Sequence, residues 1–131
     1  MKKVISLTII ASLFVMTSFA QTFDKVRKAL YYTYEKEQWV AGTPTYPERM
    51  FIIIKGSEVR VTNKSDSKYI TYGDNRHEKT SDYDSDTWDA YDEDGSTCTL
   101  MITKYFDVPG YSVFVMYADK NIAIQYITEE K

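Results

Sequence analysis

The feature that most constrains this chain is a succession of short segments rich in aromatic and β-branched residues, each ended by turn-forming residues. The clearest pair joins residues 50–55 to residues 58–62 across Gly56 and Ser57. A two-residue Gly-Ser connection suits a type II′ turn, because glycine accepts the positive φ that the first position requires. The sequence therefore predicts an antiparallel β-hairpin at residues 50–62.

Alternation along the predicted strands assigns their faces. In residues 58–62, Val59 and Val61 point one way and the polar residues the other, as in a half-buried strand. The same alternation aligns Cys98, Leu100 and Ile102 in one strand, and Tyr111, Val113, Val115 and Tyr117 in another. Residues 50–54 are apolar at every position, so we expect both faces of that strand to be covered.

The remaining segments complete an all-β pattern. Further strands are predicted at residues 30–34, 39–41, 69–72, 82–91 and 122–127, and residues 73–81 are predicted to be a charged loop. Short connections between about nine short strands indicate an antiparallel meander, forming a small barrel or a strongly curved sheet.

Residues 22–30 fit two structures equally well. Thr22 can cap a short N-terminal helix with Phe23, Val26 and Leu30 on one face. The same residues can instead be an extended lead-in to the first strand, because periodicity does not separate the two in so short a segment.

The first twenty residues are typical of a cleaved secretory signal. Lys2 and Lys3 precede a mostly apolar run from residue 4 to residue 15, and Ser18 and Ala20 provide the small residues of a cleavage site before Gln21. The run is shorter than a membrane span. We therefore expect a signal peptide at 1–20, a single β-rich domain at 21–131, a periplasmic or secreted location, and no stable membrane anchoring after cleavage.

The charge of the chain argues against two classes of partner. It has 16 Lys and Arg against 19 Asp and Glu, a net charge of −3, which becomes −5 once Lys2 and Lys3 are removed with the signal. A nucleic-acid-binding domain shows a basic face, and docking on anionic lipid also needs positive charge. The sequence predicts neither.

Acidic residues gather between residues 82 and 94. Asp82, Asp84, Asp86 and Asp89 are a candidate partner-binding surface, which would occupy a basic cleft on a toxin or hydrolase. Asp82, Asp84, Asp86 and Glu93 also overlap the ligand spacing of a calcium loop, although Thr87 stands where such a loop needs glycine. The simpler interpretation is a solvated strand, and we predict no metal site and no cofactor.

No catalytic arrangement emerges from the sequence. His77 is the only histidine and lies in a polar stretch, which indicates a surface loop. Cys98 is the only cysteine, so no internal disulfide can form, and its apolar setting favours a small buried side chain over a reactive thiol. Phosphate-binding loops and nucleophile elbows are absent from the sequence, and we predict that the protein is not an enzyme.

The aromatic residues are the other candidates for binding. Tyr31, Tyr32, Tyr34 and Trp39 cluster around one predicted turn, and consecutive strand residues face opposite ways, so some of them point away from the core. They are candidate ligand-binding residues. The alternative is that they cover a thin sheet or line a small barrel.

The leader, with Trp88-Asp89-Ala90, Asp94-Gly95 and Cys98 of one hairpin, loosely resembles uncharacterised small secreted or periplasmic β-rich proteins of Bacteroides-group bacteria. That resemblance implies no activity. In size and export alone the chain is also similar to the periplasmic lysozyme inhibitors, whose paired cysteines it lacks.

Two functions follow as expectations. The first is an exported, non-enzymatic binding module for a small apolar ligand, a glycan or a protein, acting through an aromatic sheet face or a barrel mouth. The second is a periplasmic inhibitor or immunity protein that uses the acidic segment 82–94. A lipocalin-like binder would need an apolar cavity within a closed barrel, and a filled interior would argue against it.

Overall fold

A computed structural model describes residues 21–63 and 66–129 of the chain. These residues form a nine-stranded antiparallel sheet and a short 3-10 helix at Ala118–Lys120. The strands are β2 (Gln21–Glu35), β3 (Gln38–Ala41), β4 (Phe51–Lys55), β5 (Glu58–Thr62), β6 (Asp66–Lys79), β7 (Tyr83–Asp92), β8 (Thr97–Tyr105), β9 (Ser112–Tyr117) and β10 (Ile122–Thr128). No helix in the described ranges qualifies as a membrane span. The predicted signal peptide lies outside the described residues.

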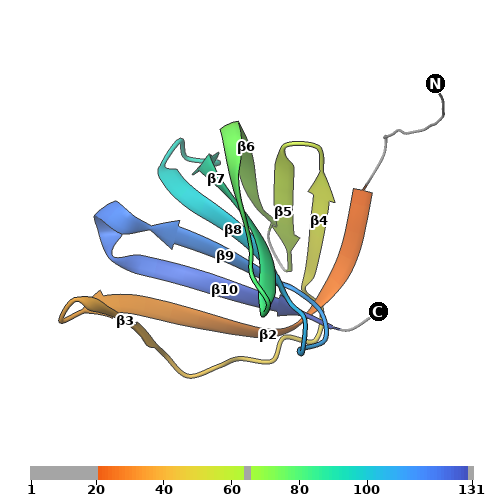
Figure 1. The fold of residues 1–131 in the computed structure, drawn as a ribbon. Helices are drawn as coiled ribbons and strands as arrows, with labels where there is room; N and C mark the ends of the chain where they lie inside the picture. The colour runs from red at the N-terminus through yellow and green to blue at the C-terminus, as the bar shows by residue number, and fades with distance from the viewer. Residues whose placement is uncertain (1–20, 64–65, 130–131) are drawn as a thin grey trace.

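The sheet closes on itself. Strands from β4 to β10 pair in chain order, and β10 then pairs with β2, which also pairs with β4 near its start (Figure 1). Eight strands therefore make a closed barrel, and β3 is an additional strand on the other edge of β2. The predicted meander is confirmed, and of the two architectures that the sequence allowed, the barrel is the one formed.

Inward-facing side chains from alternate positions build the core. Val26, Ile52, Leu100, Val113 and Val115 are fully buried, and they come from β2, β4, β8 and β9. The faces predicted for β8 and β9 are therefore confirmed. The turn between β4 and β5 agrees as well, because Gly56 has a φ of 59° as the first position of a type II′ turn requires.

Residues 22–30 belong to a strand, which decides between the two structures that the sequence allowed. The register of β2 against β10 shifts between Val26 and Lys28, so Arg27 is an extra residue in the strand. This bulge turns Val26 and Ala29, three residues apart, into the same barrel interior. A β-bulge thus imitates the spacing of a helix.

Two strands are longer than predicted. β2 has 15 residues and β6 has 14, so the strands are not uniformly short. The charged stretch predicted as a loop at 73–81 is strand up to Lys79. It follows a register shift between Tyr72 and Arg76, and then pairs with Asp84–Thr87 of β7. The prediction failed because opposite charges on the paired strands stabilise an extended segment that looks solvated in isolation.

The prediction that both faces of residues 50–54 are covered is also wrong. Ile52 is buried inside the barrel, whereas Phe51 and Ile53 face outward and remain partly exposed. The Phe51 ring stacks on Phe23 with a centroid distance of 4.8 Å, and Phe23 is itself 57% exposed. The strand is thus covered by the barrel on one side and by a single aromatic neighbour on the other.

Candidate functional site

The centre of the barrel is filled by side chains. Tyr69, Tyr117 and Tyr126 are buried there together with the valines and Leu100 of the core. The Tyr117 hydroxyl donates a hydrogen bond to Asp92 Oδ2 at 2.8 Å. Burial is the main cause that raises the pKa of each of these three tyrosines, so they stay neutral donors. These three rings occupy the space in which a lipocalin-like barrel would hold its ligand.

The outside of the barrel contains one broad surface without charge. Among the described residues of β8, β9, β10, the 30–34 part of β2 and Trp39 of β3, none of the outward-facing side chains is charged. We call this surface the uncharged face. It consists of Leu30, Tyr32, Tyr34, Trp39, Thr99, Met101, Thr103, Tyr105, Ser112, Phe114, Met116, Ala123, Gln125 and Ile127.

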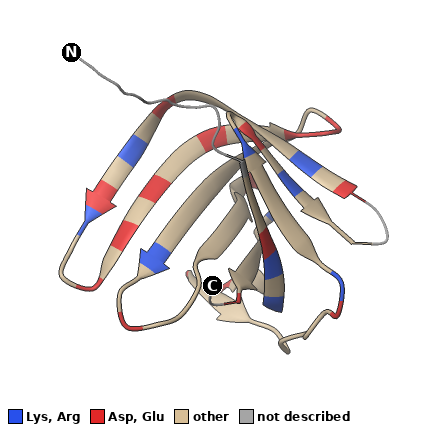
Figure 2. Cartoon of the chain, turned by 90° about the vertical axis from the view of Figure 1, so that its right-hand side faces the viewer, with Lys and Arg blue, Asp and Glu red and all other residues tan. Residues whose placement is uncertain are grey.

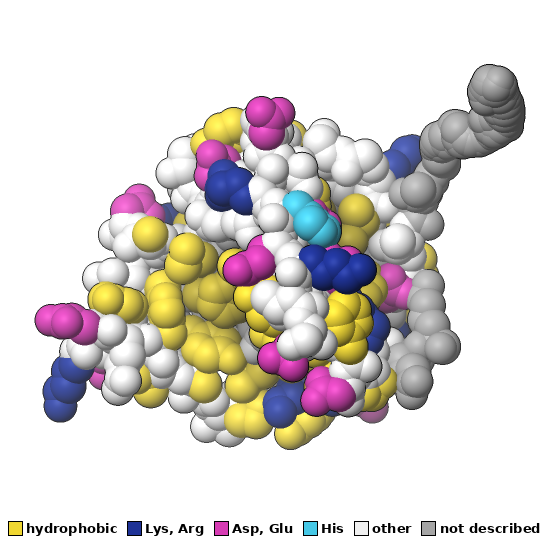
Figure 3. Space-filling model, in the orientation of Figure 1, with side chains coloured by type: hydrophobic (Ala, Val, Ile, Leu, Met, Phe, Trp, Pro, Cys, Tyr) yellow, Lys and Arg dark blue, Asp and Glu magenta, His cyan; other side chains and the backbone are white. Residues whose placement is uncertain are grey.

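Charged and hydrophobic residues are distributed unevenly over the molecule. Charged positions are concentrated on some strands and turns, whereas other strands are tan along most of their length (Figure 2). Hydrophobic side chains gather in one patch below and to the left of the centre of Figure 3, over the region of β9 and β10. Since 27% of the chain is charged, an uncharged surface across four barrel strands is a specific feature of the sequence.

Large rings cover small residues on the uncharged face. Thr103, Ser112 and Ala123 point outward and are nevertheless buried, with exposures of 6%, 6% and 0%. The rings of Tyr32 and Phe114 meet edge to face above this layer, at a centroid distance of 5.5 Å. The outer layer is thus packed by its own side chains before any partner arrives.

Hydrogen bonds hold the rings in place. The Tyr32 hydroxyl donates to Gln125 Oε1 at 2.7 Å, and the Gln125 amide donates to Ser112 Oγ at 2.9 Å. Burial raises the pKa of the Tyr32 phenol, so it remains protonated and able to donate. Side chains fixed in this way lose little conformational entropy when a partner binds.

Three of the four aromatic candidates from the sequence lie on this face. Tyr32, Tyr34 and Trp39 point outward, and Tyr34 meets Trp39 edge to face at 5.2 Å. Tyr31 does not join them, because it pairs with Ile124 and faces the inner side of the barrel wall, where it is 61% exposed. The structure thus separates Tyr31 from the other three.

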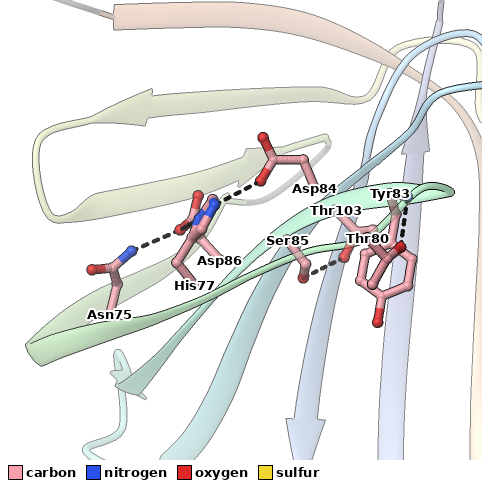
Figure 4. A network of polar contacts seen from close by, with 8 residues as sticks. All are labelled: Asn75, His77, Thr80, Tyr83, Asp84, Ser85, Asp86 and Thr103. Atoms are coloured by element: carbon pink, nitrogen blue, oxygen red, sulfur yellow. Dashed lines mark hydrogen bonds and ion pairs between the residues drawn. The ribbon is translucent and has the colours of Figure 1, made fainter.

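His77 is the centre of a second polar arrangement, on the paired parts of β6 and β7 (Figure 4). Its Nδ1 lies 2.7 Å from Asp86 Oδ1, and its Nε2 lies 3.1 Å from Asp84 Oδ1. The Asn75 amide also donates to Asp86 Oδ1, at 2.7 Å. Hydrogen bonding to Asp86 is the largest cause that raises the pKa of His77 above 6.5. The predicted loop histidine is therefore a strand residue between two carboxylates.

A hollow of about 400 Å³ lies beside this arrangement, between the β4–β5 turn and the bend of β6. Its apolar wall contains Ile54, Val59, Trp88 and Ile102, and Tyr72 and Gly73 border it at the bend. Asp86 lies opposite Ile102 in register and two residues before Trp88, so its side chain is on the same face of the sheet.

The structure does not form one acidic surface from the segment 82–94. Asp84 and Asp86 contact His77 on the inner face of β7, whereas Asp89 contacts Arg76 on the outer face at 3.3 Å. Asp82 lies in the turn before β7, where its backbone carbonyl accepts a hydrogen bond from Phe106. The four partner-binding candidates thus point in different directions.

The residues that match the spacing of a calcium loop are also held apart, because β7 is an extended strand. Asp84 and Asp86 lie within β7, and Glu93 just beyond its end accepts a hydrogen bond from the backbone of Lys68. At roughly 3.3 Å per residue, Glu93 is about 20 Å from Asp86. In the described part of the chain no group of three or more His, Cys, Asp or Glu is arranged to hold a metal ion.

One buried carboxylate was not singled out by the sequence. Asp24 is only 4% exposed inside the barrel, and its Oδ2 accepts a hydrogen bond of 2.5 Å from the Tyr111 hydroxyl. Burial, followed by this bond to Asp24, raises the pKa of Tyr111. The contact ties the start of β2 to the entry into β9.

Met101, Phe114 and Met116 of the uncharged face were not predicted, although the sequence contains a signal for them. These residues alternate with the predicted core positions of residues 97–106 and 111–117. The outward positions of a barrel strand are normally polar, so large apolar residues there indicate a surface meant for contact. Sequence reasoning followed only the inward face of each strand.

The fold and this surface together describe the protein as a closed eight-stranded meander barrel with an uncharged aromatic face on its outside. Compared with protein-family models, with curated proteins and with solved structures, the chain shows no significant match to any of them.

Proposed function

We propose that this protein is a non-enzymatic binding protein whose uncharged face holds a protein partner. The observation that carries the proposal is the composition of the outward positions of β8, β9, β10 and the 30–34 part of β2, which are aromatic, aliphatic, methionine or small and polar. The cores of protein–protein interfaces are enriched in Tyr, Trp, Phe and Met and depleted in Lys, Glu and Asp. Contiguous exposed apolar patches mark such sites.

The shape of the face favours a protein over a small molecule. Small ligands bind in concave pockets that bury most of their surface. The uncharged face is instead a broad sheet surface, and a stable protein interface needs about 800 Å² from each partner. The filled barrel centre gives less support to a small ligand inside the barrel, since Tyr69, Tyr117 and Tyr126 occupy it.

Phe114 is the residue on which binding should depend most. It lies on β9, an inner strand of the face, against Tyr32 and opposite Met101 and Gln125 in register. Hot spots of binding are aromatic residues near the centre of an interface, surrounded by contacts that exclude water. A charge at this position would have to be stripped of water when the partner docks.

The experiment places the photo-crosslinker p-benzoylphenylalanine at Met116 of the full chain in producing cells. Irradiation should give one discrete protein adduct, and adding Phe114→Lys to the same protein should remove it. The matched control places the crosslinker at Arg60, which faces outward from β5 opposite Ile53, and should give no adduct. Circular dichroism checks that the Phe114→Lys protein keeps its β-structure.

Each result decides something. An adduct at twice the mass of the chain identifies the partner as a second copy, and a different mass identifies another protein. An adduct that survives Phe114→Lys, or that also forms from Arg60, contradicts the proposal. Cellohexaose binding that Phe114→Lys removes, with no protein adduct, would replace the protein partner by a glycan.

The export signal, if cleaved as predicted, places this partner in the periplasm or outside the cell. The alternative function, inhibition through the acidic segment, has less support. It needs Asp84, Asp86 and Asp89 on one surface, and two of them contact His77 while the third contacts Arg76 on the opposite face.

A further inference from the structure

The far half of β6 is attached to the barrel along one edge. β5 pairs with β6 through Asp66–Ile70, and the last contact is the Thr71 amide donating to the Ser57 carbonyl at 2.9 Å. Beyond the shift at Gly73, which has a φ of 72°, the pairing partners within the described residues come from β7. We call residues 73–79 the outer segment of β6.

The His77 contacts join this outer segment to β7 in a way that requires a particular protonation state. Both ring nitrogens face carboxylate oxygens, at 2.7 Å and 3.1 Å. A neutral imidazole has a single N–H, so one nitrogen would present its lone pair to a carboxylate. Nδ1 is hydrogen-bonded to Asp86, whereas Nε2 makes an ion-pair contact with Asp84 that is not a hydrogen bond. Only the imidazolium carries the positive charge that makes both contacts attractive.

We propose that protonated His77 latches the outer segment of β6 onto β7, and that loss of the proton loosens this segment and widens the hollow beside Trp88. Tyr72 and Gly73 form the border of the hollow where the outer segment begins, and Trp88 lies in its wall. Movement of the segment therefore changes the access of water and solutes to Trp88.

The charged groups around His77 favour this direction on balance. From β7, Asp84 and Asp86 favour the imidazolium, and on its own strand Lys79 opposes it. From β8, Lys104 pairs in register with Asp84, but its Nζ donates to the carbonyls of Tyr105 and Val108. The balance raises the pKa of His77. The latch is thus closed below the unperturbed pKa of 6.5 and is lost as the pH rises through the higher pKa of the closed form.

The contacts on the outer face of the paired β6 and β7 strands do not involve His77. Arg76 contacts Asp89 there, and the Tyr83 hydroxyl donates to Glu78 at 2.7 Å. These contacts do not depend on pH near neutrality and, with the backbone pairing of residues 76–79 to β7, they keep the segment attached after the proton is lost. The change is therefore a local loosening of the segment that leaves the barrel closed. Asp89 consequently offers a matched control on the same strand as Asp84 and Asp86.

The experiment uses Trp39→Phe protein, in which Trp88 is the remaining tryptophan. Acrylamide quenching of Trp88 is measured between about pH 5.5 and 8.5, and proton NMR of the only histidine gives its pKa directly. Quenching should increase with pH in a one-proton transition whose midpoint equals that pKa. Exchange of the amides of residues 74–79, corrected for intrinsic pH dependence, should accelerate about tenfold for each unit by which the pKa exceeds 6.5.

Three variants test the mechanism. His77→Gln should make quenching independent of pH, and Asp86→Asn should lower both the midpoint and the pKa from NMR. Asp89→Asn should leave both unchanged. A pH transition that survives His77→Gln, a flat profile in the Trp39→Phe protein, or an equal effect of Asp89→Asn would overturn the latch. The NMR pKa remains informative if a variant alters quenching through its fold.

Discussion

The uncharged face and the outer segment of β6 belong to one sheet and are held by different forces. On the uncharged face, Tyr32 and Phe114 pack over small residues, and the register of β8 on β9 is continuous. In the outer segment, the strand follows a register shift and is joined to β7 through ion pairs of His77 and Arg76. Packing is insensitive to pH and salt near neutrality, whereas exposed ion pairs respond to both.

The two regions are suited to different roles. A surface that must meet a partner the same way each time gains from rings fixed by burial and by the Tyr32–Gln125 hydrogen bond. A segment that must move gains from a small number of exposed contacts, because its opening then costs little. The two tryptophans report on the regions separately, Trp39 on the uncharged face and Trp88 on the hollow.

The largest effect is expected from a substitution in the barrel core, against which both regions pack. Leu100 is fully buried and lies opposite Trp88 and Val115 in register. Leu100→Ala should lower the free energy of unfolding by about 2–5 kcal/mol through lost burial and a cavity. Urea titrations of Trp39→Phe and Trp88→Phe proteins should show the same loss at both reporters. A loss seen at Trp88 alone would mean that the regions unfold independently.

The next effect concerns Cys98, which is in the barrel wall behind the uncharged face. Burial is the main cause that raises the pKa of its thiol to about 11 from 9.0. At pH 8 the native protein should react with a disulfide reagent about a hundredfold more slowly than a free thiol, from the lower thiolate fraction alone. His77→Gln should not change this rate. Acceleration by His77→Gln would show that the barrel, and not the segment alone, opens.

A smaller effect separates packing from hydrogen bonding at the edge of the uncharged face, where Thr103 lies. Ser85 Oγ and Thr103 Oγ1 are 2.9 Å apart and both residues are buried (Figure 4). Thr103→Val leaves the Ser85 hydroxyl without this partner and should cost about 1–3 kcal/mol of stability. The double variant Ser85→Ala, Thr103→Val should recover most of the loss in thermal melts. Equal melting of single and double variants would argue that the hydroxyl pair contributes nothing.

The smallest effect is expected from removing the exposed ion pair between β6 and β7. Arg76 and Asp89 are 3.3 Å apart, with side chains 55% and 51% exposed. Arg76→Gln should change the free energy of unfolding by less than about 1 kcal/mol, because water screens such a pair. Melting in low and high salt checks this, with Arg60→Gln as a second exposed arginine. A loss as large as that of Thr103→Val would remove the contrast between the two regions.

Local patterns predicted much of the strand layout. The stripes Cys98, Leu100, Ile102 and Tyr111, Val113, Val115, Tyr117 follow from alternation, which any single strand displays. The Gly56 turn follows from the φ that only glycine accepts easily. Long strands were harder, because the bulge at Arg27 and the bend at Gly73 interrupt the period on which the reading depends.

The candidate site was predicted only in part. Tyr32, Tyr34 and Trp39 were chosen for their chemistry and lie on the uncharged face, but Tyr31 was chosen with them and faces the other way. The partnership of Tyr32 with Phe114 spans 82 positions of the sequence, and the pairing of His77 with Asp84 and Asp86 depends on a register set after a bulge. A sequence pattern carries no record of either register.

The amino-acid sequence by itself determined that the chain would be a β-meander with an apolar interior, because side-chain alternation and turn residues act within a few positions of one another. The closure of the barrel was decided by the tertiary structure, because β10 and β2 are joined by hydrogen bonds between residues about ninety positions apart. The same closure joined the neutral outward residues of β2 to those of β10, β9 and β8 on one outer surface. The register of β6 on β7, set after a bulge, placed the single histidine between two aspartates.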